Sequence, residues 1–247
     1  MNPENKRDRR FASTLAKGLQ ILQAFTHKDH SLGNSELAKR TGMPPSTVAR
    51  MTFTLTKLGF LQQSKPDDAY HLGPAVIALG YTARAGISFL PLAEPIMQEL
   101  ADEVGALVAL AMLDGDSVIL TRCWHPRRTH SIWLSEGHRL PLKNSSPGRT
   151  ILAAGEPIEG EGAQVGKDRE TLRARGFLSS LGHWNPGINA CSVPFWPDTS
   201  QAPMAFLCGA TIENMPQARL EKSVAPQLLK QVHNLDRSLG LSNLRPA

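Results

Sequence analysis

The chain has 247 residues, and 41% of them are hydrophobic, which is enough apolar material for two modest domains or one large one. The charge is unevenly distributed. Residues 1–65 contain 11 Lys and Arg against 4 Asp and Glu, a net charge of +7, whereas residues 66–247 contain 16 against 18, a net charge of −2. This asymmetry indicates an anionic polymer as the partner of the N-terminal quarter, although a solvated basic tail would show the same imbalance.

The cysteines and the N-terminus indicate a cytoplasmic protein. Cys123, Cys191 and Cys208 are far apart and form no Cys-x-x-Cys pair, which is typical of a reducing compartment. The first ten residues carry charges with no apolar run behind them, so no secretory signal peptide is expected. No stretch approaches the roughly 18 apolar residues of a membrane span, and we expect no membrane partner.

The first part of the chain reads as a basic arm followed by two helices. Residues 1–12 are polar and basic. Apolar and small residues then recur at helical spacing and predict one amphipathic helix: Leu15, Gly18, Leu19, Leu22 and Phe25. Asn34 or Ser35 is expected to cap a short second helix that carries Leu37 and Ala38.

A third helix is expected from about Pro45 to Leu58, after a turn in which Gly42 adopts the left-handed conformation. Its predicted buried stripe consists of Val48, Met51, Leu55 and Leu58, and a second stripe, roughly 100° around the helix, consists of Thr47, Arg50, Thr54 and Lys57. Residues 60–63 and 69–72 then predict a β-hairpin with a basic tip at Lys65.

A connecting helix is expected over residues 74–90, and the character of the chain changes after it. Another helix begins near Pro91 and Pro95, with Leu92, Ile96, Leu100 and Val104 on one face. The expected strands are residues 106–113, 117–124, 129–134, 188–196 and 204–212, with an Asp-Gly hairpin turn between the first two. The expected helices are residues 147–154, 167–175 and 217–239, the last broken near Pro226. These elements predict an α+β domain with one antiparallel sheet.

Three helices followed by a hairpin form the plan of a winged helix-turn-helix, whose exposed helix fits the major groove of duplex DNA. Ser46 and Thr47, at the start of the third helix, are expected to meet phosphates or bases. Arg50 is the candidate for a bidentate contact to guanine or phosphate, and Thr54 and Lys57 for phosphate contacts. Lys65 is expected at the tip of the wing, and Arg9 and Arg10 in a minor groove.

The same residues resemble the IclR-type regulators. The hallmarks are Ser46-Thr47-Val48 with Arg50, then Leu58-Gly59-Phe60, and Tyr70, Leu72 and Gly73 closing the wing. Leu140-Pro141-Leu142, Ser146, Gly148-Arg149 and Leu152-Ala153 resemble a later family segment, as do Gly176-Phe177, Gly187-Ile188 and Val193-Pro194. The resemblance covers nearly the whole chain. It implies a basic arm over 1–12, a winged helix-turn-helix over 13–73, a linker helix over 74–90 and a GAF-like effector domain over 91–247.

The resemblance also implies how the protein works. It implies a homodimer or a dimer of dimers that binds palindromic operators in double-stranded DNA. It places a small-molecule effector on one face of the sheet, beside a helix N-terminus suited to a carboxylate. Carried over by position, the effector site comprises Ser146, Pro147, Gly148, Ser180, Ala190, Cys208 and Ala210. Leu134 is expected to form an apolar wall of the site, and His130, Trp133 and His183 are expected to add specificity. For any single one of these residues, an ordinary role in the core is the alternative.

The chain departs from the family pattern in two respects. The segment from Leu152 to Gly176 is shorter than in most relatives, and His183 stands where relatives usually carry an acid. The identity of the effector therefore does not follow from the resemblance. The helix N-terminus, His130 and Trp133 favour a small organic acid, with aromatic acids among the candidates.

Other chemistry has little support in the sequence. No Gly-x-Ser-x-Gly elbow, metal-ligand spacing or nucleotide-binding glycine pattern occurs, so we expect no enzyme activity, no metal and no cofactor. Two functions from different classes stay open. One is a DNA-binding regulator gated by an effector, and the other is a small-molecule-binding or enzymatic GAF-like protein whose helix-turn-helix mediates protein contacts. The positive charge of the N-terminal quarter favours the first.

Overall fold

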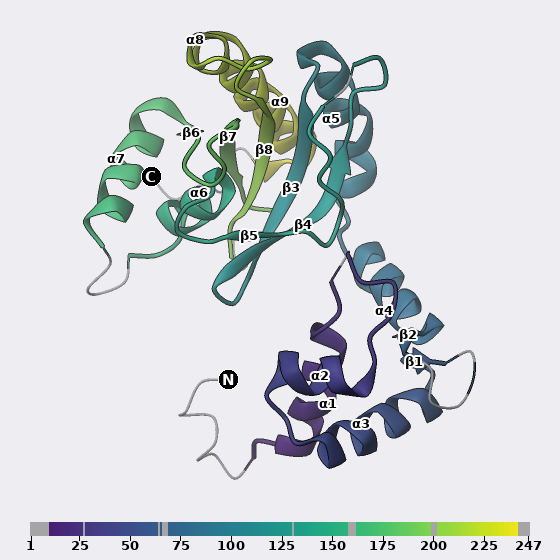
Figure 1. Ribbon diagram of the computed structural model, residues 1–247. Helices are drawn as coiled ribbons and strands as arrows, with labels where there is room; N and C mark the ends of the chain where they lie inside the picture. The colour runs from purple at the N-terminus through teal and green to yellow at the C-terminus, as the bar shows by residue number, and fades with distance from the viewer. Residues whose placement is uncertain are drawn as a thin grey trace. The chain divides into compact units, whose positions relative to one another are not determined.

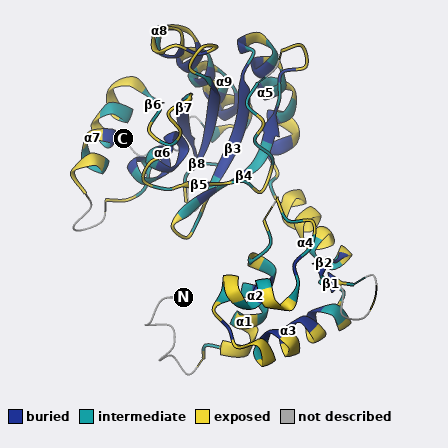
Figure 2. Cartoon of the chain, in the orientation of Figure 1, coloured by how far each residue is buried: buried dark blue, intermediate teal, exposed yellow. Residues whose placement is uncertain are grey.

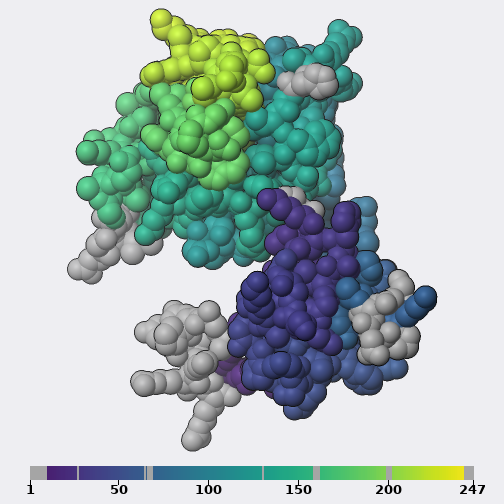
Figure 3. Space-filling model, in the orientation of Figure 1, coloured from purple at the N-terminus to yellow at the C-terminus, as the bar shows by residue number. Residues whose placement is uncertain are grey.

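The computed structural model describes residues 10–26, 28–63, 65, 69–129, 131–157, 162–198 and 202–241 (Figure 1). The chain forms two compact units, Met1–Ile87 and Ser88–Ala247. In the space-filling view, purple and blue mark the first unit (Figure 3). No single helix in the described ranges is long and apolar enough to cross a membrane.

The first unit is a helical domain with a small two-stranded wing. Its helices are α1 (Ser13–Gln23), α2 (Asn34–Thr41), α3 (Pro45–Lys57) and α4 (Pro74–Ala85), and its strands are β1 (Leu61–Gln62) and β2 (His71–Leu72). The two strands pair in antiparallel fashion, with Leu61 opposite Leu72. The core of this unit lies between the helices and the wing and consists of Ile21, Leu32, Leu37, Met43, Val48, Met51, Leu55, Leu61 and Tyr70.

The turn between α2 and α3 follows the prediction from its glycine and prolines. Gly42 has a φ of 67°, a left-handed conformation that ends α2, and Pro45 begins α3. The predicted cap of α2 is wrong, because Gly33 is the N-cap residue and no side chain caps the helix. Asn34 instead accepts a hydrogen bond from the buried Thr52 Oγ1 at 3.3 Å, which ties the start of α2 to α3.

Two predicted apolar faces of this unit need correction. Leu58 is 62% exposed, because it lies beyond the last turn of α3, where the chain turns away through Gly59. On α1 the buried residue is Ile21, whereas Leu15 and Leu19 are exposed (Figure 2). Leu22 and Phe25 of the predicted face do pack against the core, so the prediction is wrong for Leu15 and Leu19 only.

The wing ends in a close backbone approach that requires glycine. Gly73 N donates to Phe60 O at 2.8 Å, and Ala75 N donates to Gly59 O at 3.2 Å. A Cβ at Gly73 would overlap the backbone of Gly59. The hallmark glycine after the wing is thus explained by contact between β2 and the end of α3.

The second unit is built around a six-stranded antiparallel sheet of order β5-β4-β3-β8-β7-β6. The strands are β3 (Leu107–Asp114), β4 (Ser117–Trp124), β5 (Arg139–Pro141), β6 (Leu178–Leu181), β7 (Ile188–Phe195) and β8 (Met204–Thr211). The Asp-Gly hairpin between β3 and β4 is confirmed, with Gly115 at a φ of 63°. Residues 129 and 131–134 are not in a strand, because β5 occupies the free edge of β4, and β6 is a strand that the sequence did not indicate.

Helices cover both faces of this sheet (Figure 1). One face carries α5 (Leu90–Val104) and α9 (Ala225–Ser238), and the other carries α6 (Ser146–Ala154), with α7 (Ala163–Arg175) packed against α6. Between α7 and α9 the chain also forms α8 (Gln217–Arg219) and a π-helical turn over Leu220–Val224. Pro226 lies just after that turn, so the predicted break in the last helix is present.

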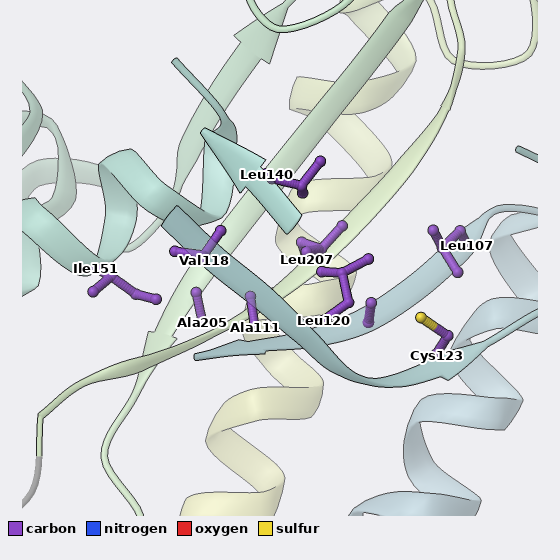
Figure 4. Packing of buried hydrophobic residues seen from close by; sticks show 10 residues of the cluster. Leu107, Ala111, Val118, Leu120, Cys123, Leu140, Ile151, Ala205 and Leu207 are labelled. Atoms are coloured by element: carbon purple, nitrogen blue, oxygen red, sulfur yellow. The ribbon is translucent and has the colours of Figure 1, made fainter. Parts of the chain in front are cut away.

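The pleat of the strands separates two cores. The core beneath α6 includes Leu107, Ala109, Ala111, Val118, Leu120, Ile151, Ala205 and Leu207 (Figure 4). An aromatic group packs on the opposite face, where the rings of Phe89 and Phe195 are 4.7 Å apart. On α5 the buried face is centred on Met97 and Leu100, whereas Leu92, predicted on that face, is 47% exposed.

Candidate DNA-binding surface and effector site

The outer surface of α3 presents a row of polar and basic side chains. Ser46, Arg50, Thr54 and Lys57 are exposed and Thr47 is half-buried, while Val48, Met51, Thr52 and Leu55 are buried against α1 and α2. The predicted second stripe is therefore the solvent-facing side of the helix. An exposed helix with hydroxyl and cationic groups in one row can reach base edges and phosphates in a major groove.

Local contacts set the positions of these side chains. Thr54 Oγ1 donates to Arg50 O at 3.0 Å, so its hydroxyl proton is directed to the helix backbone. The Lys57 ammonium lies 5.5 Å from the centre of the Phe53 ring, and Phe53 is itself 63% exposed. Arg50 has no ion pair or hydrogen bond with the described residues, so its five donors are available to a partner.

A charge cluster holds α2 in place behind α3. Arg40 bonds both carboxylate oxygens of Asp29 at 2.7 and 2.8 Å, and it also contacts Glu36 at 2.9 Å and Ala24 O at 3.0 Å. A hydrogen bond from the Arg40 guanidinium holds the pKa of the Asp29 carboxyl well below its usual range, and a hydrogen bond from the Thr26 hydroxyl lowers that pKa by a smaller amount. The cluster joins the end of α1, the following loop and α2, and so supports the turn that positions α3.

The remaining predicted DNA contacts lie outside α3. Lys65 is exposed in the wing, and Arg10 is exposed just before α1. Arg9 lies outside the described residues, as do four residues of the wing tip: Ser64, Pro66, Asp67 and Asp68.

The N-terminus of α6 is buried and largely satisfied by the protein itself. Ser145 Oγ accepts from Gly148 N at 3.2 Å and donates to Pro141 O at 2.7 Å, and Pro147 has no N–H. A Cβ at Gly148 would overlap the carbonyl of Leu142, so glycine is required where the chain before α6 crosses it. Fewer backbone N–H groups than predicted are therefore free to bind a carboxylate. The polar groups of this site are mainly side-chain hydroxyls.

Those hydroxyls form a short chain between α6 and the sheet. Ser146 Oγ lies 2.5 Å from Ser192 Oγ, which lies 2.7 Å from Thr150 Oγ1, and all three residues are buried. Ser192 and Thr150 were not predicted as site residues. Their signal in the sequence was the alternation of β7 and the i, i+4 spacing of Ser146 and Thr150 on α6.

The register of the sheet divides the predicted effector residues between its two faces. Ser180 pairs with Ala190, and Ala190 with Gly209, so these three share the face of α6 with Ser146. Cys208 pairs with Cys191 and Val108, and Ala210 pairs with Asn189, so both point to the face of α5 and α9. The structure does not bring Cys208 and Ala210 together with Ser146. Leu207, Gly209 and Thr211 take their place on β8.

The other predicted effector residues are dispersed. Leu134 packs on the core beneath α6, together with Ile132 and Trp184, which were not predicted. Trp133 is 79% exposed and stacks on His125 at 4.5 Å, so its ring lies on the surface. His183 is exposed, with its Nδ1 3.3 Å from Arg149 Nη1. His130 lies outside the described residues.

An ion pair that the sequence did not reveal anchors α6. Arg149 Nε and Nη2 donate to the Asp168 carboxylate at 2.8 and 2.5 Å, and Arg149 Nη1 donates to Ser179 O at 3.3 Å. Asp168 is the buried residue of α7, at 3% exposure, so the pair joins α6, α7 and β6. In the hallmark Gly148-Arg149 pair, Gly148 thus allows the close approach of the backbone at Leu142, and Arg149 anchors α6 to α7.

Two of the three thiols have raised pKa values, and the described residues contain no cluster of metal-ligating side chains. Burial raises the pKa of the Cys123 thiol to about 12, and contact with Cys191 together with burial raises that of Cys208 well above its usual value. A thiol with a raised pKa is a poor nucleophile at neutral pH. In the residues that the structure describes, no three His, Cys, Asp or Glu side chains are grouped to hold a metal ion.

Comparison with known proteins assigns both units to one family. Residues 14–65 match the IclR helix-turn-helix domain, and residues 82–237 match the bacterial transcriptional regulator IclR C-terminal domain. The HTH-type transcriptional regulator TsaQ1/TsaQ2 of Comamonas testosteroni is 27% identical over 241 residues, which are 90% of this chain and 86% of that protein.

Solved structures agree with this assignment. An IclR family transcriptional regulator from Brucella abortus is 31% identical and superimposes with a TM-score of 0.78 over 94% of this chain and 95% of that one. An IclR homologue from Microbacterium hydrocarbonoxydans, complexed with 4-hydroxybenzoate, has the same fold, with 18% identity, a TM-score of 0.68 and coverage of 90% and 99% of the two chains. The protein therefore belongs to the IclR family of transcriptional regulators, with an N-terminal helix-turn-helix that binds DNA and a C-terminal domain that binds an effector.

Proposed function

We propose that α3 enters the major groove of a palindromic operator and that two copies of the chain each read one half-site. The observation that carries this proposal is the exposed row on α3, in which Arg50 has no partner among the described residues. Arg50 forms the bidentate contact to a guanine or a phosphate, Ser46 and Thr47 meet the DNA at the helix start, and Thr54 and Lys57 contact phosphates. Lys65 contacts the backbone from the wing, and Arg9 and Arg10 follow the minor groove.

Fluorescence anisotropy with the DNA upstream of the protein's own coding region tests this proposal. We expect Arg50→Ala to weaken binding by about 1–3 kcal/mol, because a bidentate contact is lost. Lys28→Ala is the matched control, since Lys28 is an exposed cation of the same unit that lies outside α3. Equal affinities of the two variants would contradict the assignment of α3 as the reading helix.

The charge row also predicts how salt acts. Each phosphate contact releases counterions, so the slope of log affinity against log salt reflects the number of contacts. Lys57→Ala should reduce that slope by about 1 without changing sequence preference. Binding that stays equally tight at high salt would instead support the alternative in which this domain contacts a protein.

We further propose a small organic acid with an aromatic body as the effector, bound on the α6 face of the sheet. Apolar side chains of Ile132, Leu134 and Trp184 pack over this face, and the hydroxyls of Ser146 and Ser192 offer polar contacts at its centre. The family member complexed with 4-hydroxybenzoate supports an acid of this size. A thermal-shift panel that pairs aromatic acids with their neutral amides tests the proposal, and stabilisation by the amides alone would reject it.

Exposed apolar residues support the proposal that the protein is a homo-oligomer, either a dimer or a dimer of dimers. In the first unit, Leu15 and Leu19 of α1 are 63% and 50% exposed, and Ile77, Leu79 and Tyr81 of α4 are 58%, 58% and 67% exposed. An isolated domain rarely leaves this many large apolar side chains in water. Light scattering after gel filtration should give at least twice the chain mass of 26.9 kDa, and a monomer at micromolar concentration would exclude the proposal.

A further inference from the structure

A hollow of about 340 Å³ lies at the C-terminal end of α6, bordered by α7, α9 and the end of β7. We call it the α7–α9 hollow. Its apolar lining comes from Leu172, Val193, Pro194 and Leu229, with Trp196 as the aromatic member. This volume and lining suit a small ligand with an apolar body.

The polar groups of the hollow are mainly cationic. Arg169 and Arg173 line it from α7, His233 lines it from α9, and exposed Glu156 contributes the opposing charge. Arg173 is exposed and has no ion pair or hydrogen bond with any residue that the structure describes. A second depression on α9 shares Leu229 and His233 with the hollow and adds Lys230, Arg237 and Asp236, so its charged lining has one more cation than anions.

The hollow is distinct from the proposed effector site. The effector site lies at the N-terminal end of α6, whereas Arg169 Nη1 donates to Ala153 O at 2.8 Å and Gly155 O at 2.6 Å, the carbonyls at the other end. Nine residues of helix separate the two ends by about 13 Å. Arg169 therefore connects the hollow to the helix that supports the effector site.

We propose that the α7–α9 hollow is a second small-molecule site, which binds a carboxylate with a compact apolar or aromatic body. The carboxylate pairs with Arg173, whose planar fork matches its two oxygens, and Arg169 adds positive potential. The body of the ligand lies against Leu172, Leu229 and Trp196. Uncharged analogues bind more weakly, because they do not form the charge-assisted hydrogen bonds that a carboxylate forms with Arg173.

Methyl NMR of the full chain, with labelled Ile, Leu and Val methyl groups, separates the two sites. Leu172, Val193 and Leu229 report on the hollow, and Ile132, Leu134 and Ile151 report on the α6 face. The probes are benzoate and its neutral isostere benzamide. We expect benzoate at millimolar concentration to shift the hollow methyls in a saturable way, and benzamide to bind at least about tenfold more weakly.

Two variants of α7 complete the experiment. Arg173→Ala should weaken the response of the hollow methyls at least about tenfold, whereas Lys167→Ala, which removes an exposed cation from the same helix outside the hollow, should leave it unchanged. Glu156→Gln should tighten binding, since it removes the opposing charge. Absence of benzoate shifts at the hollow methyls, or shifts that survive Arg173→Ala, would overturn the proposal. The outcome at the α6-face methyls bears only on the effector site.

Discussion

At the scale of single residues, the hallmark glycines act through close backbone approaches. Gly148 leaves no room for a Cβ beside the Leu142 carbonyl, whereas a Cβ at Gly166 in α7 would meet nothing within 4 Å. We expect Gly148→Ala to lower the free energy of unfolding of the second unit by about 1–3 kcal/mol, as other overpacked sites do. Gly166→Ala should be neutral or should stabilise α7 by about 0.5–1 kcal/mol.

Urea denaturation followed by tryptophan fluorescence measures this difference in the full chain. All four tryptophans, Trp124, Trp133, Trp184 and Trp196, belong to the second unit, so the signal reports that unit alone. If both glycine variants unfolded at the wild-type urea concentration, the close approach at Leu142 would not limit the packing of α6.

The Asp29–Arg40 pair makes the first unit sensitive to acid. The pKa of Asp29 is lowered from its usual 3.8 in the folded state, so folding favours its ionised form. The stabilisation is therefore fully present above pH 4 and is lost as the pH falls below 3.8 towards the folded pKa. We expect Asp29→Asn to destabilise the first unit at pH 7 and to lose most of that effect at the lowest pH at which the unit stays folded.

Far-UV circular dichroism during thermal unfolding, recorded from pH 7 downward, follows this loss. Asp67→Asn removes one carboxylate from another segment of the chain within residues 1–87 and serves as the charge-matched control. A destabilisation by Asp29→Asn that is independent of pH would mean that the amide disturbs the loop by shape and not by charge.

At the scale of elements, the ends of helices could be predicted from glycine and proline. Strands were harder to predict, because a strand forms only where a neighbouring strand has a free edge to pair with. Gly42 and Gly176 end α2 and α7 in left-handed conformations, and Pro45 begins α3, because each residue acts locally. The alternation at residues 129–134 resembles a strand, but whether a strand forms depends on a free neighbouring edge, which β5 fills. The short β6, with two serines, carries too little apolar signal to be found without its partner β7.

The candidate site was predictable only up to the register of β8. Ser146, Ser180 and Ala190 share one face, whereas Cys208 and Ala210, the residues predicted on β8, lie on the other face, because neighbouring residues of a strand point to opposite sides. The ion pair of Arg149 with Asp168 could not be found either, because Asp168 lies 19 residues further along the chain and only the fold brings it to α6. Alternation of residues along a strand shows that the strand has two faces. Which of these faces meets a given helix depends on how the strand pairs with its neighbouring strands.

Adjacent substitutions on β8 test the assignment of faces. A Cβ at Gly209 would lie 3.4 Å from Ile132 Cδ1 and 3.6 Å from Ala190 Cβ, which is tolerable contact on the α6 face. We expect Gly209→Ala to change the unfolding free energy by less than about 1 kcal/mol and to weaken effector binding, because it narrows that face. Cys208→Ala should cost about 1 kcal/mol by removing a buried thiol and should leave effector affinity unchanged. Calorimetric titration with an acid that stabilises the wild type makes the comparison, and a reversed pattern would place the effector among α5 and α9.

At the scale of the whole molecule, regulation requires that effector binding change the affinity for DNA, and α4 is the segment that joins the two functions along the chain. No residue of α4 is buried within the chain, and a Cβ at Gly80, in its middle, would meet nothing within 4 Å. Within one copy of the chain, substitutions at Gly80 therefore act on the helix alone. Proline there removes a backbone hydrogen bond and costs about 3 kcal/mol of helix stability, whereas alanine strengthens the helix.

If α4 carries the coupling, Gly80→Pro should abolish the effect of the effector on operator affinity, while each ligand still binds its own site. Effectors of this kind usually change affinity by about 5- to 150-fold, so the expected result is a fall of that ratio towards one. Gly80→Ala, with an intact helix, should retain a ratio at least as large as that of the wild type. The measurement is operator affinity with and without saturating effector for the three proteins. A ratio that survives Gly80→Pro would mean that the coupling does not need a continuous α4. The effector must still bind two states of the protein with different affinities, because otherwise it could not shift the equilibrium between them. In that case, the two states would differ in the contacts between copies of the chain.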